Sequence, residues 1–393
     1  MKKIKYMCYS LCAVCMAALC LVSCADEELF PTSQVVEGQP ITLSMKMAFN
    51  RPADIVVTRS DEFSELDNLT LFVYSSTDDF QQVVSTEDGN LTLAEQGEVV
   101  ANMGIRYAIS FETTSGSKKL LAVANTSGED GSGTWDNLNT IKQQAINGNL
   151  DFEALKASIL SLQNTTDGRQ PIRITAASQL LMTGWNQGVV FSPGNGDNSN
   201  GSITNYGERG IQNQQVVIRL DRSLAHITFN IEADPEEAKG TFTPSSYRVY
   251  NIPTNSYLIN TSHLPVSGDN VGENFKTFIN YASTNVGAVN EGNYSFDFYM
   301  PENTCEEIAG VNSYAQRELW TNGTDDQNTL PEDKIWKNAP QTSTFVVISG
   351  TYVGETYNGN VTYTVHLGDF SDQNSSSNKW GNYSVIRNSS YTY

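Results

Sequence analysis

The sequence predicts a mainly β protein of two antiparallel β-sandwich domains, with a short helical insertion in the first domain. Apolar and polar residues alternate over many short segments, which is the pattern of half-buried strands. Turn-forming clusters separate these segments at irregular spacing, which favours sandwiches over a parallel sheet with crossover helices. The length of 393 residues allows two or three domains, and 16 Phe, 18 Tyr and 5 Trp residues can fill their cores.

The N-terminal region has the features of an export signal followed by a tether. A basic start precedes an apolar run at residues 6–19, and Leu-Val-Ser-Cys follows at residues 21–24. This order is typical of a lipoprotein signal peptide over residues 1–23, whose removal leaves Cys24 to carry the lipid. A transmembrane helix is the alternative, but the apolar run is shorter than the roughly 18–20 residues that span a bilayer. Residues 24–40 then form an acidic tether, and the only expected membrane contact is the lipid anchor.

Residues 41–210 are predicted to form the first sandwich, beginning with a strand at residues 41–49. In this strand the apolar residues Ile41, Leu43, Met45, Met47 and Phe49 alternate with Thr42, Ser44, Lys46 and Ala48. Period two with one apolar face indicates a half-buried strand. Further strands are expected at residues 68–74, 91–93, 106–112 and 119–124.

Helical spacing replaces the alternation between residues 135 and 162, where two short helices are expected. Asp151 can cap the second helix, whose apolar face would carry Phe152, Leu155, Ile159 and Leu162. The Gly/Asn/Ser-rich residues 191–210 are the predicted domain boundary or long loop.

Residues 211–393 are predicted to form the second sandwich. Its expected strands lie at residues 215–220, 223–231, 246–252, 294–300, 344–352 and 360–367. No internal repeat relates the two halves.

Composition argues against several classes of function. The formal net charge of −20 disfavours a nucleic-acid partner, because an acidic surface repels polyphosphate. Five of the six cysteines lie in the first 24 residues, which leaves Cys305 alone and excludes a disulfide framework in the mature chain. Cys305 lies beside Glu306 and Glu307, so nothing in its local sequence would activate the thiol.

No motif predicts catalysis, a metal site or a cofactor. The three histidines, His226, His263 and His366, are too few for most zinc or acid–base mechanisms, and two of them fall in predicted strands. Hydrolase and zinc-helix signatures are missing from the sequence. The segment from Asp197 to Glu208 matches a calcium loop at its ends but lacks the central glycine, so a solvated loop is the better interpretation. The sequence therefore predicts no enzyme.

Several segments, taken in order, resemble the fimbrillin-like, protease-matured (type V) pilins of Gram-negative gut and oral anaerobes. They are Arg59 after an early strand, Leu-Thr-Leu-Phe-Val-Tyr at 69–74, Leu-Ala-Val-Ala-Asn at 121–125, Leu-Met-Thr-Gly at 181–184, Ile-Arg-Leu-Asp-Arg-Ser-Leu-Ala-His-Ile at 218–227, Phe-Tyr-Met-Pro-Glu-Asn at 298–303, and the Tyr363, Leu367-Gly368, Tyr383 and Arg387-Asn388 pattern. No piece is specific alone, but their order spans nearly the whole mature chain. His226 stands where the family usually has lysine, on a side chain expected to be exposed.

The resemblance implies two transthyretin-like sandwiches and assembly by strand exchange. In that family a lipoprotein precursor reaches the outer membrane, and an arginine-specific protease removes the tether with the first strand. A donor strand from another pilin subunit then fills the vacated groove. Here the matching cut would fall between Arg59 and Ser60, releasing the strand at residues 41–49; Arg51 is a poorer site because proline follows it.

The family carries further strands after the segment in which this sequence stops at Tyr393. The sequence is therefore either a fragment or a subunit without its own donor strand, which would suit a terminal or accessory position. The expected function is that of a fimbrial structural, tip or accessory subunit at the cell surface that contributes to adhesion. The alternative is a monomeric surface lipoprotein that binds a glycan or a host or bacterial surface ligand, with Trp320, Trp336 and Trp380 as candidate stacking residues.

Overall fold

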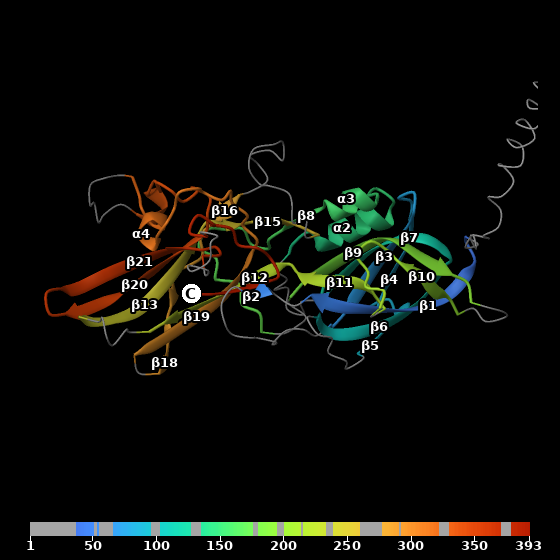
Figure 1. Ribbon diagram of the computed structural model, residues 1–393, viewed down its shortest axis with the longest axis horizontal. Helices are drawn as coiled ribbons and strands as arrows, with labels where there is room; N and C mark the ends of the chain where they lie inside the picture. The colour runs from blue at the N-terminus through green and yellow to red at the C-terminus, as the bar shows by residue number, and fades with distance from the viewer. Residues whose placement is uncertain are drawn as a thin grey trace, which may run out of the picture.

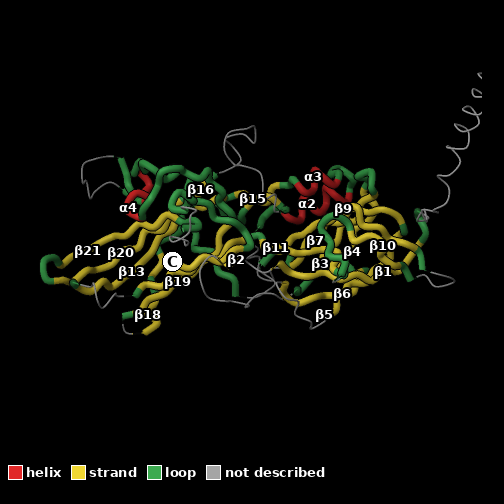
Figure 2. Tube along the Cα trace, in the orientation of Figure 1, coloured by secondary structure: helices red, strands yellow, loops and turns green. Residues whose placement is uncertain are grey.

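The computed structural model describes residues 37–393 apart from residues 51–52, 55–65, 96–102, 127–134, 176–179, 195–199, 214, 233–238, 260–276, 291, 322–329 and 371–378. Cys24, Arg59 and Ser60 lie outside the described residues. The molecule is elongated, and strands make up most of both halves, so the predicted mainly β character is confirmed (Figures 1 and 2). Within the described part of the chain, no helix is long and apolar enough to cross a membrane.

The first half contains a nine-stranded sheet. Eight strands follow the order β4-β3-β7-β9-β11-β1-β6-β5, and β10 pairs with β9 at the side. The strands are β1 (Pro40–Asn50), β3 (Leu69–Ser75), β4 (Phe80–Ser85), β5 (Leu91–Glu95), β6 (Met103–Thr114), β7 (Gly116–Ala124), β9 (Met182–Ser192), β10 (Ser202–Tyr206) and β11 (Val216–Arg222). The strands expected from alternation in this half are all present.

This sheet folds over so that its two parts face each other. Leu43 and Met47 from β1 share one buried cluster with Leu71 from β3, Ala122 from β7 and Val189 from β9. Residues from strands that are distant in the sheet can share a core only if the sheet curls or splits into two layers. The inner face of the first half is therefore a sandwich core.

Two short helices, α2 (Leu138–Ile146) and α3 (Phe152–Lys156), cover the outer face of β3, β7 and β9 (Figure 1). The predicted cap is confirmed, since the Asp151 carboxylate accepts a 2.7 Å hydrogen bond from the Ala154 N–H. The predicted helical face was wrong beyond Lys156. Ile159 is 38% exposed and lies in β8 (Ile159–Ser161), which pairs with β15 (Asn255–Tyr257) almost a hundred residues away. Periodicity could not reveal this partner.

The Gly/Asn/Ser-rich stretch is not a boundary between sheets. Residues 202–206 form β10, which makes a hairpin with β9, and β11 returns to pair with both β9 and β1. β11, the strand that follows the predicted domain boundary between residues 210 and 211, therefore still belongs to the first sheet. Because residues 202–206 are extended, they also do not form the second half of a calcium loop.

The second half stacks a five-stranded sheet on a four-stranded sheet. The five-stranded order is β18-β19-β12-β22-β2, and the four-stranded order is β17-β13-β20-β21. The strands are β2 (Ala53–Asp54), β12 (Leu224–Ile231), β13 (Gly240–Tyr250), β17 (Thr284–Asn285), β18 (Gly287–Asn290), β19 (Asn293–Pro301), β20 (Phe345–Gly354), β21 (Asn358–His366) and β22 (Ser389–Thr392). Smaller elements are β14 (Ile252–Pro253) paired with β16 (Phe278–Ile279), helix α4 (Tyr314–Arg317) and a 3-10 turn at Pro331–Asp333.

Aromatic rings join these two sheets. Tyr247 of β13 stacks on Phe296 of β19 with ring centroids 3.8 Å apart, and Phe296 stacks on Phe229 of β12 at 4.9 Å. Tyr393 lies against Phe229 at 5.0 Å. Contacts between aromatic rings stabilise a core beyond the area that they bury.

The sheets are mixed and not purely antiparallel as predicted. β1 runs parallel to β11, and β22 runs parallel to both β12 and β2. Parallel neighbours need long connections, and each of these pairs joins segments that lie far apart in the sequence. Alternation identifies a strand but carries no information on the direction of its neighbour.

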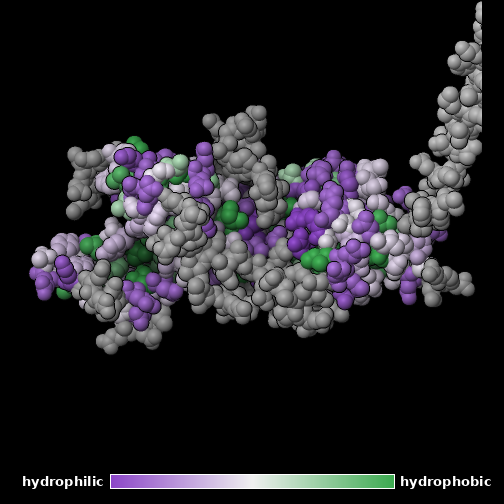
Figure 3. All heavy atoms as spheres, viewed as in Figure 1, coloured by the Kyte–Doolittle hydropathy of each residue, from purple (hydrophilic) through white to green (hydrophobic). Residues whose placement is uncertain are grey.

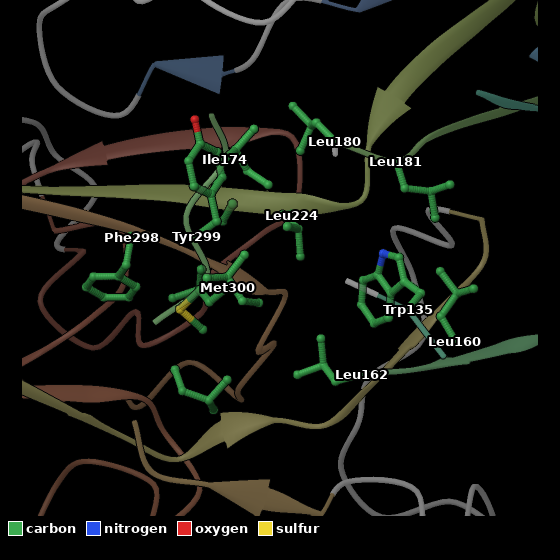
Figure 4. Close-up of a cluster of buried hydrophobic side chains, with 14 of the residues drawn as sticks. Trp135, Leu160, Leu162, Ile174, Leu180, Leu181, Leu224, Phe298, Tyr299 and Met300 are labelled. Atoms are coloured by element: carbon green, nitrogen blue, oxygen red, sulfur yellow. The ribbon is translucent and has the colours of Figure 1, made fainter. Parts of the chain in front are cut away.

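One buried apolar cluster continues from the first half into the second (Figure 4). Trp135, Leu160 and Leu162 from the helical insertion lie in the same cluster as Leu224 of β12 and Met300 of β19. The Trp135 indole N–H donates to the Ser223 hydroxyl at 3.2 Å. On the face drawn in Figure 3, hydrophobic residues otherwise appear only as small separate patches.

Candidate functional site

β1 is an interior strand of the first sheet although it comes from the N-terminal end of the described chain. It pairs antiparallel with β6 over nearly its whole length, from Pro40 opposite Thr114 to Ala48 opposite Arg106. On its other side it pairs parallel with β11, from Lys46 opposite Val216 to Phe49 opposite Leu220. Removing β1 would therefore expose the hydrogen-bonding edges of two strands at once.

The alternation predicted for β1 is confirmed by the burial of its side chains. Ile41 and Met45 are 3% exposed, and Leu43 and Met47 are fully buried. Ser44 on the opposite face is exposed, and Thr42 and Lys46 are half-buried. The side chain of Phe49 lies outside the described residues, so its predicted burial is not tested. Ala48 was assigned to the polar face, yet it is 1% exposed because it packs against Val216 in a small outer cluster.

The N-terminal part of β1 has a second neighbour that is not part of a named strand. The Gly201 N–H donates to the Thr42 carbonyl at 2.8 Å, next to an isolated bridge between Thr42 and Asn200. A Cβ at Gly201 would lie 2.7 Å from Cδ1 and 3.1 Å from Cβ of Ile41, so a larger residue here would require the Ile41 side chain to shift. β6 thus pairs with β1 along nearly its whole length, whereas the other side of β1 is held at Thr42 and from Lys46 to Phe49.

The chain segment that leaves β1 also reaches the second half of the molecule. β2 pairs with β22, with Ala53 opposite Ser389 and Asp54 opposite Ser390, and it forms the edge of the five-stranded sheet. In the sequence, Arg59 and Ser60 follow β2 and precede β3. A cut between them would separate both β1 and β2 from the rest of the chain. Sequence reasoning missed β2, because two residues carry no periodic signal.

A buried ion pair fixes the segment that leads into β22. Arg387 is 1% exposed and pairs with Glu302, which follows β19. The Arg387 guanidinium also donates to the Ser256 hydroxyl at 2.6 Å and to the Tyr257 carbonyl at 2.7 Å, both in β15. Because β15 pairs with β8, this arginine ties the C-terminal segment to the junction between the two halves. In the sequence, only the Arg387-Asn388 pattern pointed to a role for this arginine.

The histidines have structural environments. His226 lies in β12, where it stacks on Tyr299 at 4.4 Å and bonds to Asp297 at 3.1 Å, so it is half-buried and not exposed as expected. The hydrogen bond from His226, followed by the charges of His226 and Arg173, lowers the pKa of Asp297 against the effect of burial. His366 is fully buried in β21 and bonds to Glu318 at 2.5 Å. His263 lies outside the described residues.

Among the described residues, no three His, Cys, Asp or Glu side chains are grouped as a metal site. Cys305 is half-buried and forms no disulfide with another described residue. Of the candidate stacking residues, Trp336 is 7% exposed and packs against Phe345 at 5.5 Å, so it fills the end of the sheet. Trp380 stacks on Phe370 at 5.8 Å, and Trp320 packs against the same cluster as Trp336.

Comparison with known proteins found a matching family model and solved structures to which the chain is similar. A family model described as a domain of unknown function (DUF4906) matches residues 298–393. No curated protein matches the sequence. In structure, the chain is similar to a candidate cell adhesion protein from Parabacteroides distasonis, with 13% identity, a TM-score of 0.45, and coverage of 85% of this chain and 86% of that chain.

It is also similar to a candidate cell adhesion protein from Bacteroides eggerthii, with 15% identity, a TM-score of 0.42, and coverage of 84% of this chain and 80% of that chain. A fimbrial assembly protein from Parabacteroides distasonis gives 12% identity, a TM-score of 0.36, and coverage of 90% and 91%.

Proposed function

We propose that this chain is a fimbrial structural, tip or accessory subunit that is exported as a lipoprotein and assembled by strand exchange. Lipid on Cys24 holds the precursor at the outer membrane, and cleavage between Arg59 and Ser60 by an arginine-specific protease releases the N-terminal segment. A donor strand from another subunit then takes the place of β1. The observation that carries this proposal is that β1 is an interior strand of the first sheet. In the sequence, residues 51–68 link it to β3, so one cut in this link would detach it from the chain that follows.

The free energy that β1 contributes to the fold favours its replacement by another strand over its removal without replacement. Burying one apolar side chain of this size contributes about 1.5–3 kcal/mol, so Ile41, Leu43, Met45 and Met47 together contribute roughly 6–12 kcal/mol before ordering costs. The main-chain bonds to β6 and β11 are lost with them. A foreign strand with the same alternation would recover both contributions, since main-chain pairing supplies affinity and alternate side-chain pockets supply specificity.

β2 adds a second acceptor position to the same proposal. Its departure with β1 would open the outer edge of β22 in the five-stranded sheet. A donor segment long enough to follow the path of residues 40–54 would contact both halves of the acceptor subunit. We interpret these halves as the two transthyretin-like sandwiches that the sequence resemblance implies.

The direct test is the N-terminal sequence of the chain recovered from purified surface fibres. The proposal requires that it begins at Ser60 and that Arg59→Ala blocks both the cut and assembly. Arg51→Ala is the matched control and should be processed normally. A chain that starts at Cys24 in assembled fibres would contradict the proposal.

The second candidate function, a monomeric lipoprotein that binds a glycan or another surface ligand, is favoured by one cavity. A space of about 320 Å³ lies between α2 and the sheet and is lined by Phe72, Val123, Leu138 and Ile141. Thr70 also lines it and is 3% exposed. Volumes near this value are at the small end of ligand pockets. A binder of this kind would need neither cleavage at Arg59 nor fibre assembly, so the same sequencing experiment separates the two functions.

A further inference from the structure

β21 is an edge strand whose outer part lacks the features that normally protect an edge from pairing with another chain. It lies at the end of the four-stranded sheet, and β20 is its only strand partner in the described part of the chain. Its nine residues, Asn358–His366, contain no Lys, Arg, Asp, Glu or Pro. Natural edges are usually blocked by charges, proline, bulges or a covering element, because a free edge is a template for another strand.

The pairing with β20 shows which main-chain groups of β21 point outward. The Leu367 N–H donates to the Thr344 carbonyl, and the Gly354 N–H donates to the Tyr357 carbonyl. Antiparallel pairs alternate between bonded and non-bonded, and the register from Phe345–His366 to Val353–Asn358 has no bulge. The N–H and carbonyl groups of residues 358, 360, 362, 364 and 366 therefore face away from β20.

The inner end of this edge is covered by α4 and the residue after it. The Glu318 carboxylate accepts the His366 N–H at 2.8 Å, and the Arg317 guanidinium donates to the His366 carbonyl at 3.2 Å. The Tyr314 hydroxyl donates to the Thr364 carbonyl at 2.8 Å. These side chains bond to the outward groups that the register identifies, so the assignment of the edge is independently supported.

The outer part of the edge is open. Among the described residues, no hydrogen bond is made by the N–H groups of Asn360, Thr362 and Thr364 or by the Thr362 carbonyl. The Asn360 carbonyl accepts a bond from the Tyr357 hydroxyl at 3.2 Å, which leaves its second lone pair available. The β20–β21 hairpin forms the end of the molecule farthest from the first half, so another chain can approach it (Figure 1).

We propose that this edge pairs with the same edge of a second copy of the chain, antiparallel about a twofold axis at Thr362. In that arrangement Thr362 of each copy bonds to Thr362 of the other, and Asn360 of one copy bonds to Thr364 of the other. Every open N–H then meets an outward carbonyl, and the Thr364 carbonyl accepts it with the lone pair that the Tyr314 hydroxyl does not use. The interaction does not depend on strand exchange at β1 and would join subunits side by side.

The side chains favour a second copy over an unrelated strand. In this register Val361 of one copy lies opposite Tyr363 of the other, and the pair occurs twice. Tyr363 is 48% exposed, although one side of its ring packs against Phe242 at 4.9 Å. Aromatic pairs with β-branched residues, and Thr–Thr pairs, are among the stabilising cross-strand contacts. Because the strand has no charged residue, the pairing places no like charges directly opposite each other across the ladder.

A ladder of this length makes a small interface, so pairing should be weak between free molecules and stronger where copies are tethered on one surface. Cysteine cross-linking on intact cells measures it directly. In Thr362→Cys the two sulfur atoms would lie at the axis, in a pair whose Cα separation of roughly 5.5 Å permits a disulfide. Thr351→Cys is the matched control, because Thr351 is an exposed threonine on β20, one strand further from the axis. Wild type controls for Cys305.

We expect disulfide-linked dimers in Thr362→Cys and none in Thr351→Cys or wild type. Adding Thr364→Pro to Thr362→Cys removes one open N–H and keeps the carbonyl that Tyr314 bonds, and proline is tolerated at a solvent-facing edge. This double variant should lose the cross-link while its melting temperature stays that of Thr362→Cys. A monomeric Thr362→Cys protein, equal cross-linking of the two cysteine variants, or no effect of the proline would overturn the proposal.

Discussion

Leu43→Ala should destabilise the uncleaved chain, whereas Ser44→Ala should not. Leu43 is fully buried opposite Phe111 of β6, within the core that both parts of the first sheet enclose. Truncating a buried leucine to alanine costs about 2–5 kcal/mol, because contacts are lost and a cavity remains. For a unit of 150–250 residues, each kcal/mol lowers the melting temperature by roughly 2–4 °C, so a fall of about 4–20 °C is expected.

Ser44 is the neighbouring residue on the solvent face of the same strand, and its hydroxyl is 3.4 Å from that of Ser110. Exposed substitutions of this kind usually change stability by no more than about 0.5 kcal/mol. Thermal unfolding followed by circular dichroism compares the two variants with wild type. Equal shifts for both would show that β1 is not buried on one face as described.

A second step links this stability to exchange. After cleavage at Arg59, a wild-type peptide of residues 37–54 should replace the Leu43→Ala segment and restore the wild-type melting temperature. The same peptide carrying Leu43→Ala should restore less. If the wild-type peptide has no effect on the cleaved chain, or both peptides act equally, strand exchange at this site is refuted.

Three further predictions concern the anchor, the junction and the pH dependence. Cys24→Ala should abolish acyl labelling and release the protein from the outer-membrane fraction, and unchanged fractionation would contradict lipidation there. Arg387→Ala should cost about 3–5 kcal/mol in chemical unfolding, because it leaves the half-buried Glu302 carboxylate without its cation and the Tyr257 carbonyl without its donor, and a loss of stability below 1 kcal/mol would show that the pair is not structural. The pKa of Asp297 is lowered chiefly by the His226 hydrogen bond, so its contribution to stability is present above pH ~4 and is lost as pH falls through the lowered value. Melting temperatures between neutral and acidic pH should therefore fall less steeply in Asp297→Asn than in wild type, and parallel curves would refute this.

The alternation in residues 41–49 determined the most important element of the site. Apolar residues at every second position can be buried together only on one face of a strand, so the burial of Leu43 and Met47 followed from their spacing. The same logic located most strands in both halves, and the Asp151 cap followed from local hydrogen-bonding chemistry. These features depend on residues within about ten positions of one another.

Tertiary structure alone decided which strands are neighbours. β1 lies between β6 and β11, β2 adds to β22, and β8 adds to β15, and each of these pairings joins residues separated by tens to hundreds of positions. Main-chain hydrogen bonds are the same for every residue type, so a sequence cannot specify the partner of a two- or three-residue strand through them. The open edge of β21 was likewise decided only by the tertiary structure. Its lack of charge is visible in the sequence, but only the positions of β20 and α4 determine that the outward N–H and carbonyl of Thr362 make no hydrogen bond among the described residues.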